Sequence, residues 1–426
     1  MARVFWLAII VWVFLRVALL SLGWSGNTDP AARDRVLRHF TVEDIDRGRE
    51  YTRNGFWGRV ASPFVTVGLM ALLLQWGVFG RLFGRISDAV GAGWWSTNLL
   101  FILACFALIQ IASLPFDYYL GYLVEKRMGF SNMTSIDWFL RYFKMSVVSW
   151  MFQAGGILLV LWVFRIFPRA WPLGIPVATT LFGIAVTLIF PIIITPLFYN
   201  QKPIIDGPLK QRILEISVQA GVPVAGIFEI DESRYSNHTN AYFTGLFSQK
   251  RIVLYDTLIK SHTVDESALI FAHEVGHWKH DHVFIGLALG FLGTLLGCGL
   301  LWFTFPLLRG EPLFGLGELD SARNLPFFLI VTVIGNLFFA PVEAQISQIF
   351  ERQADMASLE LTGLAKVFIE AEKRLARDNR SELLPHPFRV FWLYSHPPTI
   401  ERIAMGERFE QTGSNSGGIS DISEKR

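Results

Sequence analysis

The chain has 426 residues, of which 52% are hydrophobic and 17% are charged, and its mean hydropathy is +0.39. A soluble domain carries roughly 25% charged residues, so this composition excludes an ordinary soluble protein and indicates a membrane protein. The 38 Lys and Arg nearly balance the 36 Asp and Glu, which leaves a net charge of +2 and no global field that could hold nucleic acid.

Seven apolar stretches are long enough to cross a hydrocarbon core, which takes about 20 helical residues. The first follows Arg3 and ends at Gly23, so a cleaved signal peptide is the competing interpretation, although its length and the internal Arg16 favour a retained anchor. The seven predicted spans cover residues 4–22, 63–82, 99–120, 145–167, 173–199, 283–307 and 325–342.

Two polar blocks follow the fifth and the seventh spans, and because two spans separate them, both lie on the same side of the membrane. We therefore expect five transmembrane helices with loops in residues 1–200, a first polar segment in 201–282, two more spans in 283–345 and a second polar segment in 346–411. Residues 412–426 are rich in Gly, Ser and Asn, and we expect this tail to be disordered.

Basic residues in the short loops predict the orientation, because cytoplasmic loops retain Lys and Arg during insertion. The loops after the first and third spans are the more basic ones, which puts both polar blocks in the cytoplasm. These loops carry Arg33, Arg35, Arg38, Arg47, Arg49, Arg53, Arg59, Lys126, Arg127, Arg141 and Lys144, whereas the opposite loops carry Arg81, Arg85, Arg165, Arg169, Arg309 and Arg323.

The pattern of the first polar block predicts a small unit that contains both helices and strands. An amphipathic helix is predicted over residues 209–220, and short strands are predicted over 226–230, 240–244 and 251–255. A second helix is predicted over 267–282, entered through acidic residues that suit the positive end of a helix dipole.

His273-Glu274-Val275-Gly276-His277 lies on that second helix and carries the clearest chemistry in the sequence. At about 100° per residue the two His are about 40° apart on one helix face, so both can bind a single zinc ion. Glu274 lies beside this face and can take a proton from a zinc-activated water. The only cysteines, Cys105 and Cys298, lie in apolar runs, which excludes a cysteine-ligated site.

A catalytic zinc site needs a third protein ligand, and a carboxylate commonly completes a pair of His. Glu351 begins the second polar block, and Asp355 follows four residues later on the same helix face. We predict Glu351 as the third ligand and Asp355 as an acceptor that orients a ligand His. The alternative for Glu351 is a surface carboxylate paired with Arg352.

His396, held between Ser395 and two prolines, is a candidate donor to a developing oxyanion, or else an ordinary loop histidine. Arg402 could act in the same way or brace the fold. His280 and His282 could suggest a second metal site, but polar residues at the membrane boundary are the more ordinary interpretation.

At these residues the chain resembles the type I CAAX prenyl proteases, and the resemblance extends over most of its length. The matching segments, in order, are Pro115-Phe116-Asp117-Tyr118-Tyr119, Glu125-Lys126-Arg127-Met128-Gly129-Phe130-Ser131-Asn132-Met133-Thr134, Asn240-Ala241-Tyr242-Phe243-Thr244-Gly245, Ala272 to Trp278, Glu351 to Asp355, and Ser395-His396-Pro397-Pro398 with Glu401-Arg402.

The resemblance implies an α-helical membrane protein with seven helices around an intramembrane chamber and a small α+β, zincin-like metallopeptidase domain. It implies one zinc ion per chain, bound by His273, His277 and Glu351, with Glu274 as the base, Asp355 behind the ligands and His396 beside the oxyanion. Residues expected to contact the substrate are Asn240, Ala241 and Tyr242 on an edge strand, with Arg402.

Family members cleave prenylated carboxy-terminal peptides, so the expected partners are membrane lipid and a peptide or protein substrate, with or without a prenyl group, and no nucleic acid. The segment from Phe130 to Thr134 departs from the eukaryotic pattern, and the chain ends without an endoplasmic reticulum retrieval signal. Both features favour a bacterial homologue in the inner membrane with a cytoplasmic catalytic face, for which membrane protein quality control is an equal alternative task.

Two other interpretations remain. An HtpX-type membrane protease shares the zinc motif but resembles a shorter chain with fewer spans. A non-catalytic interaction protein or a metal transporter would place polar ligands on transmembrane faces, whereas here they lie at span ends and in polar blocks. Such a protein would also have no use for Glu274.

Overall fold

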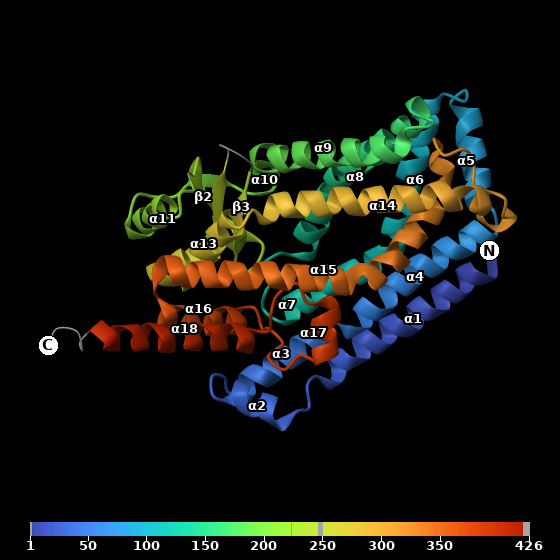
Figure 1. Ribbon diagram of the computed structural model, residues 1–426. Coiled ribbons are helices and arrows are strands. Elements are labelled where there is room, and N and C mark those ends of the chain that lie inside the picture. The colour runs from blue at the N-terminus through green and yellow to red at the C-terminus, as the bar shows by residue number, and fades with distance from the viewer. Residues whose placement is uncertain (1, 223, 246–249, 421–426) are drawn as a thin grey trace.

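The computed structural model describes residues 2–222, 224–245 and 250–420 (Figure 1). Long helices run side by side through most of the molecule, and a small sheet with shorter helices lies at one end. The first half contains α1 (Ala2–Ser25), α2 (Pro30–Leu37), α3 (Val42–Asn54), α4 (Phe56–Gln75), α5 (Val78–Ala89), α6 (Trp94–Tyr118), α7 (Glu125–Arg127), α8 (Ser135–Ile166), α9 (Trp171–Ile189) and α10 (Thr195–Phe198).

The second half holds the sheet, the two last long helices and the helices that follow them. Its strands are β1 (Gln201–Pro203), β2 (Gly226–Ile230), β3 (Ala241–Thr244) and β4 (Arg251–Tyr255). Its helices are α11 (Pro208–Gln219), α12 (Asp256–Ser261), α13 (Val264–Lys279), α14 (His282–Arg309), α15 (Leu325–Thr362), α16 (Ala365–Asp378), α17 (Pro387–Leu393) and α18 (Thr399–Ser420).

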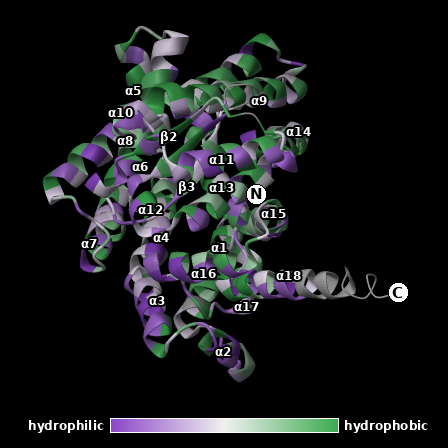
Figure 2. Cartoon of the chain, turned by 90° about the vertical axis from the view of Figure 1, so that its left-hand side faces the viewer, coloured by the Kyte–Doolittle hydropathy of each residue, from purple (hydrophilic) through white to green (hydrophobic). Residues whose placement is uncertain are grey.

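Within the described residues, seven helices are long and apolar enough to cross a membrane, which confirms the predicted class of fold. They cover Arg3–Leu22, Phe56–Gln75, Trp94–Arg127, Ser135–Ile166, Trp171–Phe198, His282–Arg309 and Ala322–Thr362. In Figure 2, α9 is mainly coloured as hydrophobic, whereas α2 and α3 are mainly hydrophilic. The protein is therefore a multi-pass membrane protein with polar helices outside the spans.

The second span begins and ends earlier than the predicted residues 63–82. Helix α4 ends at Gln75, and Gly77 follows with a φ of 65°, a left-handed conformation that glycine adopts without strain. The apolar residues beyond it belong to the separate helix α5. The predicted bounds of the span were wrong because the sequence stays hydrophobic across this turn.

The membrane helices share one apolar core in which Trp12, Phe101 and Trp171 are almost fully buried. A chamber of about 550 Å³ opens between α4, α6, α8 and α15. Its wall includes Asp117, whose carboxylate accepts hydrogen bonds from Ser113 and from Tyr142, each 2.7 Å long. The chamber therefore offers a polar strip inside an otherwise apolar bundle.

The four strands among the described residues are ordered β1-β2-β4-β3, so β3 lies at an edge of the sheet. Strand β3 pairs antiparallel with β4, and Ala241 lies opposite Leu254. Helices α11 and α13 cover the sheet through a core that includes Ile213, Ile252 and Phe271. The strands over 226–230 and 251–255 have the predicted bounds, and the third begins one residue later than predicted, at Ala241.

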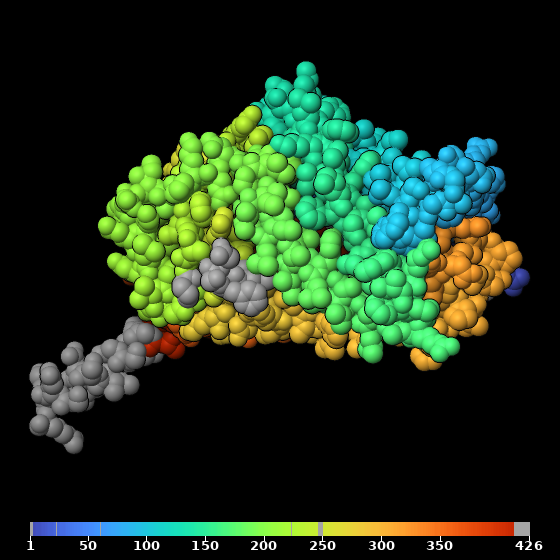
Figure 3. Space-filling view, turned by 90° about the horizontal axis from the view of Figure 1, so that it is seen from above, coloured from blue at the N-terminus to red at the C-terminus, as the bar shows by residue number. Residues whose placement is uncertain are grey.

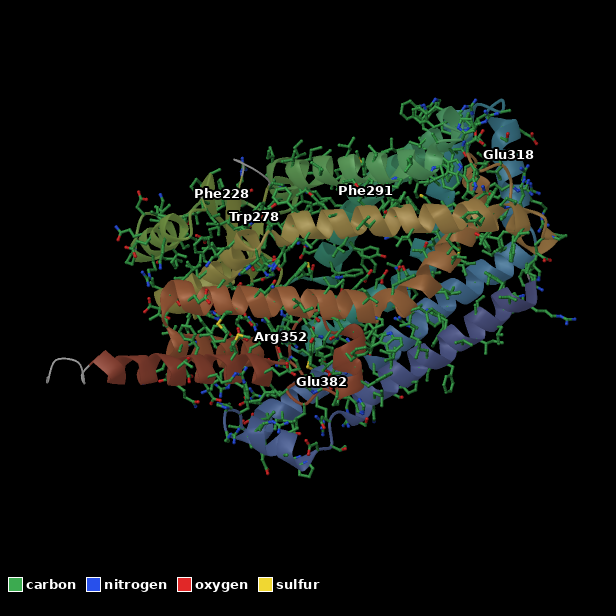
Figure 4. All side chains as sticks on the ribbon, in the orientation of Figure 1. Phe228, Trp278, Phe291, Glu318, Arg352 and Glu382 are labelled. Carbon is green, nitrogen blue, oxygen red and sulfur yellow. The ribbon has the colours of Figure 1, made fainter. Side chains whose placement is uncertain are left out.

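The sheet and helices α11 to α13 lie at one end of the long helices, and α15 extends from the bundle to pack along α13. Asp281, with a φ of 55°, separates α13 from α14, so the helix predicted over 267–282 ends at Lys279. Figure 4 places Trp278 at this junction and Glu318 at the opposite end of the bundle. The space-filling view from above likewise shows the residues that follow α10 at one end of the molecule (Figure 3).

Helix α18 continues to Ser420, through the first part of the tail for which the sequence predicts disorder. Its N-terminal half packs on α16 through Met405 and Phe409, and this packing stabilises the start of a helix that the downstream composition alone does not predict. The rest of the predicted tail, residues 421–426, lies outside the described residues.

Candidate active site

Helix α13 is fixed at its start by a capping box. The Thr263 hydroxyl accepts from the Glu266 backbone N–H, and the Glu266 carboxylate accepts from the Thr263 N–H at 2.7 Å. Arg374 of α16 then donates to the same carboxylate at 3.0 Å. The cap sets where the helix begins, and therefore which face its two histidines present.

Gly276 lets α13 and α15 come unusually close together. A β-carbon at this position would lie 2.8 Å from the Ala354 Cα and 2.9 Å from the Ala354 carbonyl oxygen. The packing of the two helices therefore requires a glycine between the two histidines. The close approach brings Glu351 and Asp355 of α15 to the histidine face of α13.

His273, His277 and Glu351 form a group whose ligand atoms all lie within 4.8 Å of one another. The His273 and His277 Nε2 atoms are 3.2 Å apart, and they lie 3.3 and 3.6 Å from the nearest Glu351 carboxylate oxygens. Two nitrogens and a carboxylate thus face one point.

The chemistry of this donor set fits a divalent cation. The buried Glu351 Oε2 atom lies 3.3 Å from the Nε2 atoms of both His273 and His396, so imidazoles enclose it. Burial lowers the pKa of His277 to about 4, which keeps its imidazole neutral and able to donate a lone pair. Two imidazole nitrogens and a carboxylate oxygen are the protein ligands of an open zinc site.

Asp355 lies behind His273 and orients it. The His273 Nδ1 lies 2.8 Å from Asp355 Oδ1, which leaves Nε2 directed at Glu351. Burial lowers the pKa of His273, but hydrogen bonds to Asp355 and Glu351 outweigh this and raise it to about 10. These carboxylates therefore favour positive charge at this position.

Arg402 holds Asp355 in turn. Its Nε and Nη2 donate to the two carboxylate oxygens at 2.8 and 2.6 Å, and its Nη1 lies 2.8 Å from Glu372. Burial, only partly offset by Arg402, raises the pKa of Glu372 to about 7. The sequence predicted Arg402 as a substrate contact, a donor to the oxyanion or a brace, and in the structure its guanidinium contacts Asp355 and Glu372. Glu372 was not predicted, since no motif includes it.

His277 has its own support, which sequence reasoning assigned to the membrane boundary. The His277 Nδ1 lies 2.9 Å from His282 Nδ1, and His282 Nε2 lies 2.8 Å from Gln353 Oε1. The His282 ring stacks on Phe350 with centroids 4.1 Å apart. The turn at Asp281 brings His282 back to the motif, and helical spacing alone could not show this.

Glu274 lines a cleft of about 440 Å³ together with His273, Ala241 and His396. Burial raises the pKa of Glu274, although the Phe243 backbone N–H donates to it and favours its ionised form. A carboxylate with a raised pKa beside a metal group is suited to accept and return a proton. His396 enters from the other side, with its Nε2 3.3 Å from Glu351 Oε2 and its Nδ1 2.8 Å from the Ser395 hydroxyl.

The edge strand β3 runs along the same cleft. The Tyr255 N–H donates to the Asn240 carbonyl at 3.1 Å, so by antiparallel alternation the backbone groups of Ala241 and Phe243 point away from β4. Asn240 is exposed, and its side chain accepts from the Ala241 N–H at 2.8 Å. The open side of β3 therefore presents the carbonyl groups of Ala241 and Phe243 beside Glu274, while their N–H groups donate to Asn240 and to Glu274.

Comparison with known proteins agrees with this arrangement. The profile of peptidase family M48 matches residues 203–408, and that of the CAAX prenyl protease N-terminal region, described as five membrane helices, matches residues 29–200. CAAX prenyl protease 1 of Saccharomyces cerevisiae is 30% identical over 322 residues, covering 72% of this chain and 71% of its own length. The chain belongs to the CAAX prenyl protease family of M48 peptidases.

Two further relatives span most of this CAAX protease family member. The Bacillus subtilis protein named uncharacterized metalloprotease YhfN is 28% identical over 345 residues, and the match covers 80% of that protein and 80% of this chain. The crystal structure of S. mikatae Ste24p matches with a TM-score of 0.80 and 25% identity, covering 93% of this chain and 97% of that one. The protein is thus a membrane protease of a metallopeptidase family, and its substrate is a peptide or protein.

Proposed function

We propose that this protein is a zinc metalloendopeptidase of the CAAX prenyl protease type, with one zinc ion per chain. The observation that carries the proposal is the convergence of His273, His277 and Glu351 on one point, with Glu274 in the adjoining cleft. Glu274 is not needed to hold a metal, so its place in the cleft supports hydrolysis rather than metal storage or transport.

His273, His277 and Glu351 would hold the zinc ion, with Asp355 and His282 fixing the two imidazoles. When bound, zinc lowers the pKa of a water toward about 7 and polarises the scissile carbonyl. Glu274 takes the proton as the water attacks and passes it to the leaving amine. His396 stabilises the oxyanion from the opposite side of the cleft.

The substrate would add to the open side of β3 as an extended strand. Hydrogen bonds from the substrate main chain to the carbonyl groups of Ala241 and Phe243 would align it, and alternate side chains would contact Asn240 and Tyr242. Arg402 acts behind Asp355 in this scheme. A strand held there passes Glu274, which is the position that peptide hydrolysis requires.

The substrate class we propose is a carboxy-terminal or membrane-associated peptide, with or without a prenyl group. The chamber of about 550 Å³ between the spans is large enough for an apolar chain, while the polar peptide reaches the cleft. The yeast relative is named a CAAX prenyl protease, and the Bacillus relative bears no substrate in its name. The profile of five membrane helices favours this type over the shorter HtpX type.

The arrangement of the chain follows the same proposal. Residues 201–282 and 346–411 together form the peptidase domain, joined to five spans in 1–200 and two in 283–345. The basic loops after the first and third spans support a cytoplasmic position for this domain, and we propose the inner membrane of a bacterium as its location.

Purified protein in detergent tests the proposal by measuring bound zinc alongside cleavage of matched prenylated and unprenylated peptides. We expect about one zinc per chain, cleavage by the unchanged protein, and loss of cleavage with retained zinc in Glu274→Gln. A preference between the two peptides identifies the substrate class, and equal cleavage of unmodified membrane peptides favours quality control. Stoichiometric zinc without any Glu274-dependent cleavage would refute the enzyme and favour a metal-binding interaction protein.

A further inference from the structure

The segment that follows the third span has no role in the mechanism above, yet it pairs with the chain that enters the edge strand. Ser131 and Ser236 form an isolated antiparallel bridge. It is flanked by hydrogen bonds from the Asn132 N–H to the Tyr235 carbonyl at 3.0 Å and from the Asn237 N–H to the Phe130 carbonyl at 2.9 Å. A membrane loop is therefore fastened to residues just before β3.

Side chains reinforce this pairing. The Asn132 amide donates to the Ser233 carbonyl and to the Asn237 side chain, both at 2.8 Å, and the Asn237 amide donates to the Gly129 carbonyl at 2.8 Å. The two asparagines satisfy one another and the facing backbone, so the two segments are held in a single register.

A contact between His238 and Glu125 adds a charged pair to this attachment. The His238 Nε2 lies 2.9 Å from Glu125 Oε2, and its Nδ1 lies 3.0 Å from the Asn379 side-chain oxygen. The imidazole also stacks on Phe130, with centroids 4.0 Å apart and planes 17° apart. Glu125 accepts in addition from the Tyr51 hydroxyl at 2.6 Å. With both nitrogens bonded and its ring stacked, His238 has one fixed orientation.

The position of this contact gives it a consequence for the cleft. His238 comes two residues before Asn240, and its carbonyl accepts from the Thr257 hydroxyl at 2.7 Å. Among the described residues β3 has a sheet neighbour on one side only. Pairing with β4 therefore fixes β3 within the sheet, whereas the Glu125 contact fixes it relative to the helix that leaves the membrane.

We propose that Glu125 and His238 are positioning residues, a strand clamp that sets the register between the edge strand and the membrane chamber. The inference rests on the proposed function. When a lipid or an apolar segment anchors a substrate among the spans, this clamp fixes the distance between that anchor and β3. The clamp therefore selects which peptide bond of an anchored substrate reaches Glu274.

Loss of the clamp should show as a loss of register. With His238→Ala or Glu125→Ala, we expect a lipid-anchored peptide to be cut at neighbouring bonds as well, with kcat/KM lowered about tenfold through KM, the scale of one charge-assisted hydrogen bond. The double variant should lose less than the two single variants added together, because both remove the contact between His238 and Glu125. A matched control is His39→Ala, which removes another His–Glu contact, 3.4 Å long, to Glu407 on α18.

A cross-link can replace the clamp. Directly opposed residues of a non-hydrogen-bonded antiparallel pair lie about 4.5 Å apart at Cα, within the range of a disulfide. Ser131→Cys with Ser236→Cys, oxidised in the His238→Ala background, should restore the single cleavage site, and reduction should abolish the restoration. A merely structural role for His238 would not give reversible rescue of the cleaved bond.

Hydrogen exchange tests the clamp without any substrate. His238→Ala should speed exchange of the backbone amides of Ala241–Thr244 and leave those of α13 unchanged. Unaltered exchange, or a single cleavage site with unaltered kcat/KM in the variant, would overturn the clamp. Absence of zinc-dependent cleavage by the unchanged protein would refute the proposed function, and the exchange result would still decide the clamp.

Discussion

Gly276 on α13 lies directly against the backbone of Ala354 on α15, with no room for a β-carbon between them. The contact occurs one residue before His277 and one residue before Asp355, so the spacing of the two helices at this point is also the spacing of the metal group. The separation of α13 and α15 therefore sets the distances between the histidines of α13 and the carboxylates of α15.

Gly276→Ala should therefore disrupt the site more than it disrupts the helix. Alanine is favoured over glycine in a helix by about 1 kcal/mol, so α13 alone would gain stability. The added methyl forces the helices apart, and we expect zinc affinity to fall at least about tenfold, the lower range for loss of ligand orientation. Zinc competition with a chelator measures this. Gly286→Ala, where a β-carbon meets nothing within 4 Å, is the matched control and should retain zinc.

Arg402→Lys should weaken zinc binding although Arg402 touches none of the proposed ligands. Lysine keeps the charge but cannot make the two parallel bonds to Asp355, so Asp355 no longer fixes His273. Loss of such a supporting contact costs about 10–100-fold in metal affinity or activity. Arg352→Lys, which alters an exposed pair with Glu401, should have little effect. Equal zinc affinity in both variants would contradict the bracing role.

Thr263→Ala should lower the stability of the peptidase domain by about 1 kcal/mol, the usual contribution of an N-cap side chain. The change removes the acceptor for the Glu266 N–H, and it lies far from the cleft along α13. Thermal unfolding followed by intrinsic fluorescence measures the loss. Thr263→Ser retains the oxygen and should restore the unfolding temperature, while zinc content stays constant in both variants.

His238 should make stability depend on pH above its ordinary pKa of 6.5. Burial lowers the pKa of His238, but hydrogen bonds with Glu125 and Asn379 outweigh this and raise it above its ordinary value of 6.5. The native state thus binds the proton more tightly than the unfolded chain does. This stabilisation is complete below pH 6.5 and is lost as the pH rises through the raised pKa. Unfolding curves for the unchanged protein and His238→Ala should converge as the pH increases.

Local patterns predicted the parts of the site that lie on one element. The spacing of His273 and His277 predicted a helix face, and apolar runs predicted seven spans. Glu351 needed the additional expectation of a third ligand. The contacts of His238 with Glu125, 113 positions away, and of Arg402 with Glu372 depend on how distant elements pack. No local periodicity contains that information. For the same reason the sequence did not predict that the turn at Asp281 brings His282 back to His277.

The metal group also has a topological consequence. His277 and Glu351 flank a stretch of chain that leaves along α14, turns at the far end of the bundle and returns along α15. A metal ion bound at both residues closes this stretch into a loop, much as a disulfide would. The entropy that such a closure removes from the unfolded chain grows with loop length. Bound zinc would therefore link two whole membrane spans at the ends that carry the metal group, and a chelator would remove this link without breaking a covalent bond.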